Sequence, residues 1–168
     1  MGYTLTNNVS LDGGNANGGM RASITHTKNN WIMPNTGFER LTAQVSANYK
    51  ISDQLKMNAK ISYTNKKSDN LPATGYNNQS ISYFMIFQNP NVDLNWYRPI
   101  WKRGQEKRVQ IHPFSSFIDN PYLIAYEMTN GMNSNAIVAT LAFTYEFSKK
   151  FDLMVRSGIN TNSESREM

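Results

Sequence analysis

The sequence predicts an all-β protein: an antiparallel meander of about six long strands, forming a segment of a transmembrane β-barrel, with one long loop containing short helices. Three observations predict this fold: alternation of apolar and polar residues, strands of barrel length, and connections that are short and long in turn. Composition agrees, since 22 Asn, 15 Ser and 12 Thr make up 49 of the 168 residues, and helix interiors use these types sparingly. A helical bundle is therefore excluded as the main architecture.

The clearest alternation lies in the middle of the first half. From Leu41 to Ile51 every odd-numbered residue is apolar and every even-numbered residue is polar, and the same pattern resumes from Leu55 to Thr64. Residues 52–54 between them are of turn type. This pattern predicts a β-hairpin of strands near 40–51 and 55–66, with one apolar face and one polar face.

Two further hairpins follow the same design. Strands near 134–147 and 151–163 flank a turn at Ser148–Lys150, with Phe143, Tyr145 and Phe147 on the apolar side. A weaker pair near 3–12 and 19–28 flanks the glycine-rich stretch 13–18, which we interpret as a hairpin turn. Together the three hairpins predict six strands.

Strand length distinguishes two β architectures that share this alternation. Strands of soluble sheets average about 5–6 residues, whereas membrane barrels use about 9–11 residues tilted near 45°. The eleven residues of Leu41–Ile51 would extend about 36 Å, or about 26 Å along the membrane normal at that tilt. Aromatic residues such as Tyr49 and Phe151 collect beside the short turns, as in an interfacial girdle. The alternative is a large soluble sheet packed on a partner domain.

The connections separate two rims of the sheet. Residues 52–54 and 148–150 are short connections, whereas residues 29–39 and above all the loop 68–133 are long. Outer-membrane barrels have short periplasmic turns and long extracellular loops, so we expect 68–133 to be extracellular. Within it we expect two short helices, one over Ile81–Phe87 and one after Asn120-Pro121.

Several stretches of the sequence, in loops as well as in strands, carry a family resemblance. Residues 8–15, 21–27, 32–37, 82–96 and 120–122 resemble the barrel of the SusC/RagA family of TonB-linked outer-membrane transporters. The resemblance implies a barrel of 22 strands, an N-terminal plug domain, energy from TonB, and a SusD-like lipoprotein as partner. It also implies import of glycans or peptides across the cell outer membrane. We interpret 1–168 as a partial barrel, and we expect the plug domain and a signal peptide to be absent from these residues.

The candidate contacts with substrate or lipoprotein lie in the long loop. Trp96, Tyr97 and Trp101 offer flat aromatic faces that stack on sugars or peptide side chains, and Arg98 among them donates hydrogen bonds. The polar face is expected to line the barrel interior with four cations, Lys50, Lys56, Lys60 and Arg156. The alternative function, of another class, is a soluble β-sheet module that binds carbohydrate through Asn side chains and the three aromatics.

Other chemistries have little support. The chain has no cysteine and two histidines far apart, so we expect no metal and no cofactor. The loop carboxylates Asp93, Asp119 and Glu127 have no spacing that favours acid–base chemistry, so we expect no enzymatic activity. The net charge is +5, but the basic stretch 101–108 is interrupted by Glu106 and reads as a solvated loop. We therefore expect no nucleic acid as partner.

Overall fold

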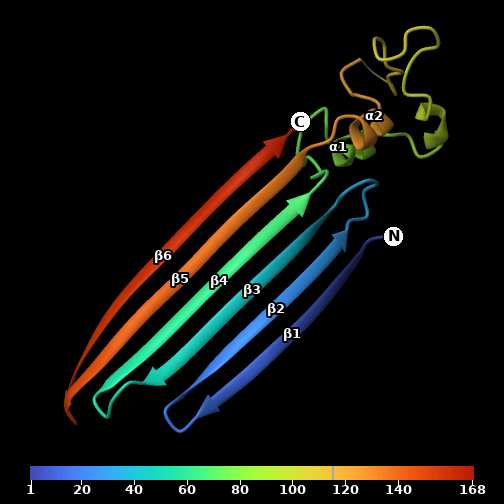
Figure 1. Cartoon of the computed structure of the whole chain (residues 1–168). Helices are drawn as coiled ribbons and strands as arrows, with labels where there is room; N and C mark the ends of the chain where they lie inside the picture. The colour runs from blue at the N-terminus through green and yellow to red at the C-terminus, as the bar shows by residue number, and fades with distance from the viewer. Residues whose placement is uncertain (115) are drawn as a thin grey trace.

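The computed structural model describes residues 1–114 and 116–168 and contains one six-stranded antiparallel sheet. Its strands follow one another across the sheet in chain order (Figure 1). They are β1 (Tyr3–Asn15), β2 (Gly18–Asn30), β3 (Gly37–Lys50), β4 (Leu55–Ser68), β5 (Gly131–Ser148) and β6 (Phe151–Glu167). The predicted all-β meander is confirmed. Within the described residues the sheet is open, with β1 and β6 as its edges.

Most strands extend further toward the long loops than the sequence pattern predicted. The ladder between β5 and β6 continues to the pair Gly131 and Glu167, and that between β2 and β3 continues to Asn30 and Gly37. These end residues are polar or glycine. Strand pairing uses backbone groups, so it continues where the apolar alternation, on which the predicted bounds depended, has stopped.

The short turns differ in detail from their prediction. Most of the glycine-rich stretch belongs to the strands, since Gly14 pairs with Gly19 and only Ala16 and Asn17 lie between β1 and β2. Gly18 is needed for close approach, because a Cβ there would lie 2.2 Å from the backbone oxygen of Asn48 on β3. At the next turn, Ile51 lies outside β3, and its N–H donates to the Leu55 oxygen at 2.8 Å.

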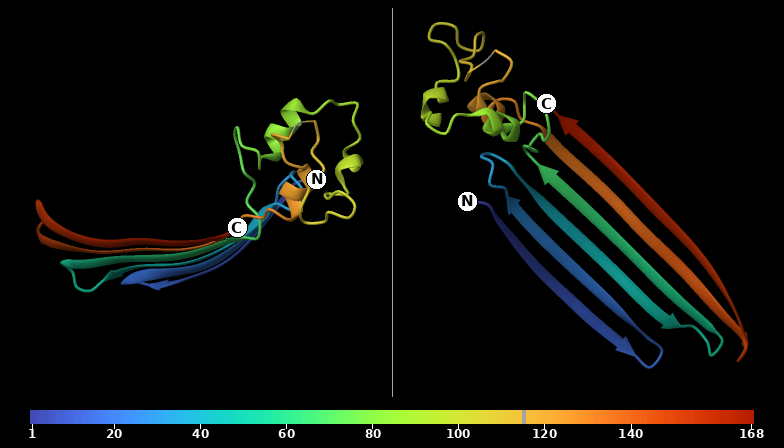
Figure 2. Two further views of the ribbon diagram at one scale, coloured as in Figure 1. Left: turned by 90° about the horizontal axis from the view of Figure 1, so that it is seen from above. Right: turned by 180° about the vertical axis from the view of Figure 1, so that it is seen from behind.

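The two faces of the sheet have opposite chemistry. Residues that pair directly across strands lie on the same face, so the register defines each face. The polar face consists of the even-numbered residues of β1, β3, β4, β5 and β6 and the odd-numbered residues of β2, and the apolar face consists of the others. The sheet is bowed along its strands (Figure 2).

The apolar face carries a continuous band of side chains. Three rows cross all six strands: Val9, Ile24, Ala43, Tyr63, Ile137 and Thr161; Leu11, Ala22, Val45, Ile61, Ala139 and Ile159; Gly13, Met20, Ala47, Ala59, Leu141 and Ser157. Two rows nearer the short turns add Tyr49, Met57, Phe143 and Val155, then Leu55, Tyr145 and Leu153. Many of these side chains are exposed, Leu11 by 73% and Ile61 by 51%. Toward the long loops the next row is mostly polar. It contains Asn7, His26, Leu41, Asn65, Asn135 and Ser163, of which only Leu41 is apolar.

The long connection between β4 and β5 folds into a small helical module, defined here as the described part of residues 69–130, which lies beyond one end of the sheet (Figure 1). It contains α1 (Ile81–Phe87), the 3-10 helix η1 (Leu94–Tyr97) and α2 (Pro121–Tyr126), so the prediction of short helices is confirmed. The side chains of Ser80 and Asn120 cap the N-termini of α1 and α2. No helix among the described residues combines the length and apolar character needed to cross a membrane.

Amide side chains attach the helical module to the sheet. Asn35, in the β2–β3 connection, and Asn70 both donate from Nδ2 to the backbone oxygen of Ala125 in α2, at 2.8 and 3.3 Å. Asn70 also accepts the N–H of Asn130 at 3.0 Å. These bonds hold α2 against the end of the sheet where β4 ends and β5 begins.

Candidate functional site

The four candidate residues of the long loop occupy different environments. Tyr97 is only 7% exposed and packs in the core of the helical module with Phe84 and Ile118. Its ring meets that of Phe84 edge to face, with centroids 6.0 Å apart. Its backbone oxygen accepts a hydrogen bond from the fully buried Asn120 side chain at 2.9 Å. These contacts give Tyr97 a structural role.

Trp96 and Arg98 flank Tyr97 and point to solvent. Trp96 is 66% exposed, although it is the residue next to the buried tyrosine. Arg98 is exposed and ends η1, where its N–H donates to the Asn95 oxygen at 3.1 Å. An exposed indole can stack on a ring and an exposed guanidinium can donate hydrogen bonds, so Trp96 and Arg98 each keep the chemistry expected of a contact residue.

Trp101 is half-buried and held by two elements. Its Nε1 donates to Oε1 of Glu127, the C-cap residue of α2, at 3.3 Å, and its backbone forms an isolated antiparallel bridge with Gln110. Within the described part of the chain, no ring contact joins Trp96, Tyr97 and Trp101 to one another. The structure therefore does not bring the three aromatics into one cluster.

The helical module also exposes further apolar side chains that the sequence analysis did not select. They include Ile86 at 70% exposure and five others: Tyr76, Met85, Phe87, Phe114 and Tyr126. A contiguous patch of exposed apolar side chains is typical of an interaction site, and these six are candidates for one. The signal for them in the sequence is weak, because a loop without periodicity does not show whether an apolar residue is buried in a core or exposed.

A second candidate region lies on the polar face of the sheet. The four cations expected to line the interior are all on this face, together with four that the sequence analysis missed: Arg21, Arg40, Lys66 and Arg166. Against these eight cations stand four carboxylates of the same face, Asp12, Glu146, Asp152 and Glu164. On the apolar face the charges of the strand residues cancel, because two cations, Lys28 and Lys67, accompany two carboxylates, Glu39 and Glu167. The positive charge of the sheet is thus concentrated on one face.

Ion pairs neutralise only part of this charge. Arg21 lies 3.6 Å from Asp12, Lys56 pairs with Glu146, and Arg166 pairs with Glu164. Lys50 reaches Asp53 in the turn at 3.0 Å. Among the described residues no carboxylate pairs with the other four cations, which are Arg40, Lys60, Lys66 and Arg156.

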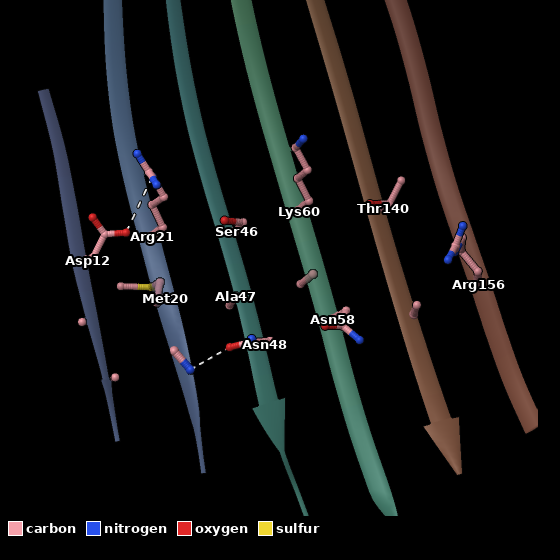
Figure 3. Close-up of a pocket in the computed structure, with 15 residues that line it drawn as sticks. Asp12, Met20, Arg21, Ser46, Ala47, Asn48, Asn58, Lys60, Thr140 and Arg156 are labelled. Atoms are coloured by element: carbon pink, nitrogen blue, oxygen red, sulfur yellow. Dashed lines mark hydrogen bonds and ion pairs between the residues drawn. The ribbon is translucent and has the colours of Figure 1, made fainter. Parts of the chain in front are cut away.

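Two of the unpaired cations line a hollow of about 790 Å³ on the polar face (Figure 3). Lys60 and Arg156 project from β4 and β6, and Arg21 projects from β2 (Figure 3). The hollow forms between these cations because the other residues that line it there are small, namely Gly14, Gly19, Ser46, Thr140 and Ala142. The volume lies within the usual range of ligand sites, about 300–1,000 Å³.

One carboxyl group of the helical module has a shifted pKa. In the helical module, backbone N–H groups of Glu106 itself and of Gly104 hold the pKa of the Glu106 carboxyl below its ordinary value, and the Gly104 N–H lies 2.9 Å from Oε1. This carboxylate shapes a turn. No group of three or more His, Cys, Asp or Glu side chains in residues 1–114 and 116–168 is arranged to hold a metal ion.

Comparison with known proteins adds no assignment. Protein-family models give no match to the chain, and neither do curated proteins. Its function is therefore inferred from the two faces of the sheet and from the helical module.

Proposed function

We propose that the chain forms six consecutive strands of a transmembrane β-barrel, in a transporter of the SusC/RagA type in the cell outer membrane. The observation that carries this proposal is the band of registered apolar rows on one face. On β4 the band runs over the nine residues Leu55–Tyr63, about 30 Å along the strand and about 22–25 Å along the membrane normal at a tilt of 35–45°. That height is close to the apolar band of about 25 Å in outer-membrane barrels.

The burial pattern supports a lipid environment for this face. A water-soluble sheet buries its apolar face against a second layer, whereas here Val9, Leu11 and Ile159 are each more than 60% exposed. The polar row of Asn7, Asn65 and Asn135 then lies where the strands leave the hydrocarbon. In this proposal the open edges β1 and β6 pair with further strands of the barrel, since long unpaired edges promote aggregation.

In the same proposal the helical module is extracellular. It contacts the imported glycan or peptide, or the SusD-like lipoprotein, through exposed residues led by Trp96 and Arg98. TonB supplies the energy for import. The buried Tyr97 and the hydrogen-bonded Trp101 support the shape of the module.

The experiment that tests the proposal uses the absence of cysteine in these 168 residues, so an introduced cysteine is unique within them. Any cysteine in the rest of the full-length protein is first replaced by serine. Single cysteines at each position from 55 to 66 are spin-labelled in the membrane-reconstituted protein, and collision with oxygen and with a water-soluble nickel complex is measured. Molecular oxygen is concentrated in lipid, so labels at the odd-numbered positions 55–63 should collide more often with oxygen. Labels at the even-numbered positions should collide more often with the nickel complex.

A sheet that packs on a soluble domain gives a different result. The odd-numbered labels are then shielded from both reagents, and the protein stays in the aqueous phase without detergent. That outcome would reject the membrane proposal and favour the soluble carbohydrate-binding module.

A further inference from the structure

We propose that the hollow on the polar face binds an acidic carbohydrate, that is, a sugar chain bearing carboxylate or sulfate groups. This inference rests on the proposed function, because it names the substrate class that passes the polar face. It starts from the excess of cations on that face and from the two unpaired cations at the hollow, Lys60 and Arg156.

The register arranges the cations of the hollow across the strands. One row contains Asp12, Arg21, Ser46, Lys60 and Thr140 in direct pairing, and the next contains Gly19, Asn48, Asn58, Ala142 and Arg156. Arg21, Lys60 and Arg156 are thus on alternate strands, β2, β4 and β6. Neighbouring strands lie about 4.8 Å apart, so successive cations follow one another about every 10 Å across the sheet.

Neutral donors and acceptors lie between the cations. The Asn48 side chain accepts the Gly19 N–H at 2.8 Å, whereas no hydrogen bond among the described residues occupies the side chains of Asn58 and Thr140 (Figure 3). An amide offers both a donor and an acceptor, which matches the hydroxyl groups of a sugar. Cations at intervals with free amide and hydroxyl groups between them fit an acidic sugar better than a neutral one.

Asp12 does not reverse this preference. It is the one carboxylate at the hollow, and it lies 3.6 Å from Arg21, which offsets its charge. Among the described residues no carboxylate holds Lys60 or Arg156, and Arg156 donates from Nη2 only to the Met154 sulfur at 3.6 Å, a weak acceptor that an anion can replace. Rings of Lys and Arg give anion selectivity to membrane pores by the same electrostatics.

The test measures binding of an oligogalacturonate to the reconstituted full-length transporter that contains this chain, by isothermal titration calorimetry. Its methyl ester has the same length without the charge and is the matched neutral probe. We expect the acid to bind at least tenfold more tightly than the ester, and this preference should fall as salt shortens the screening length from about 10 Å at 0.1 M to about 3 Å at 1 M.

Variants then locate the site. Lys60→Gln and Arg156→Gln should each weaken binding of the acid about fivefold, the upper range for a solvent-exposed charge pair, and the double variant about 25-fold. Lys149→Gln, in the short β5–β6 turn, is the matched control and should leave binding unchanged. Asn58→Ala should weaken the acid and the ester by the same factor, because it removes a contact with hydroxyl groups.

Three results would overturn the inference. The first is equal affinity for the acid and the ester, and the second is a loss of affinity in Lys149→Gln as large as that in Lys60→Gln. The third is a glutamate oligopeptide that binds as tightly as the sugar and whose affinity is unchanged by Asn58→Ala. The last would assign the hollow to an acidic protein segment. The spin-label pattern of residues 55–66 is measured on the same preparation. If the acid does not bind but the labels still alternate between lipid and water, only this inference is rejected. If the labels do not alternate, the proposed function is rejected.

Discussion

The helical module has a buried apolar core, whereas most large apolar side chains of the sheet are exposed. Phe84 is fully buried among Tyr97 and Ile118, and Asn120 beside them is fully buried with its hydrogen bonds satisfied. In the sheet, Leu11 and Ile61 are 73% and 51% exposed, although they stand in ordered rows. The module follows the rules of a water-soluble core, and the sheet does not.

Under the proposed function, this contrast reflects two different surroundings within 168 residues, water for the module and hydrocarbon for the apolar face of the sheet. Backbone ladders satisfy the N–H and C=O groups of the inner strands β2 to β5, and in the proposed barrel the open edges of β1 and β6 pair with further strands. Such a sheet needs no second layer if its apolar face meets hydrocarbon. The module must exclude water by packing, and it does so with few residues. Substitutions that are harmful in one region should therefore be tolerated in the other, and each experiment that follows uses that difference.

The largest effect is expected in the core of the module. Phe84→Ala removes a fully buried ring and should destabilise the module by about 3–5 kcal/mol. Hydrogen exchange of the Gln88 N–H, which bonds to the Phe84 oxygen at 3.0 Å, reports the opening of α1. The control Ile86→Ala, at a side chain that is 70% exposed, should change stability by less than about 0.5 kcal/mol. Equal exchange rates in the two variants would contradict a water-excluding core.

The next effect is expected on the apolar face of the sheet. Ile61→Arg places a charge in the apolar band and should destabilise the membrane-inserted protein by about 2–4 kcal/mol, whereas Ser62→Arg on the polar face should be nearly neutral. The two positions are neighbours on β4, so backbone effects cancel. The measurement is the folded fraction in a heat-modifiability gel after urea titration. Similar losses in both variants would show that the face assignment is wrong.

A smaller effect is expected at the buried amide of the module. The Nδ2 of Asn120 donates to the oxygens of Tyr97 and Ile111, both at 2.9 Å, and Oδ1 accepts the Tyr122 N–H at 2.9 Å. Asn120→Ala removes the cap of α2 and leaves two carbonyls without this donor, which should destabilise the module by about 1–3 kcal/mol.

Limited proteolysis of residues 69–130 measures this destabilisation. The control is Asn89→Ala, because the Asn89 side chain accepts one local turn bond, from the Asn91 N–H at 3.0 Å, in an exposed segment. A cleavage rate in Asn120→Ala no higher than in the control would reject the structural role of the buried amide.

The sheet was largely predictable from the sequence and the module was not. Alternation and turn residues are local signals, and they placed all six strands to within a few residues. The burial of Tyr97 next to an exposed Trp96 depends on Phe84 and Ile118, which lie far away in the sequence and become neighbours only in the fold. The sequence pattern underestimated the positive charge of the polar face for a related reason, since Arg21 and Lys60 are brought to the same row only by the register of two strand pairs, β2–β3 and β3–β4.

The smallest effect concerns a single turn of the module and its pH dependence. Backbone N–H groups of Glu106 and Gly104 lower the pKa of the Glu106 carboxyl from its ordinary value of 4.5, so the folded turn favours the charged form. A lowered pKa contributes stability that is present above the unfolded value and is lost as the pH falls through the folded value. The Gly104 amide resonance, followed by NMR in the module of the intact protein, should therefore titrate with a midpoint below 4.5. Glu106→Gln should abolish this titration while Glu127→Gln keeps it, because Glu127 bonds to Trp101 and not to the turn. A midpoint at or above 4.5, or an unchanged titration in Glu106→Gln, would show that the carboxylate does not hold this turn.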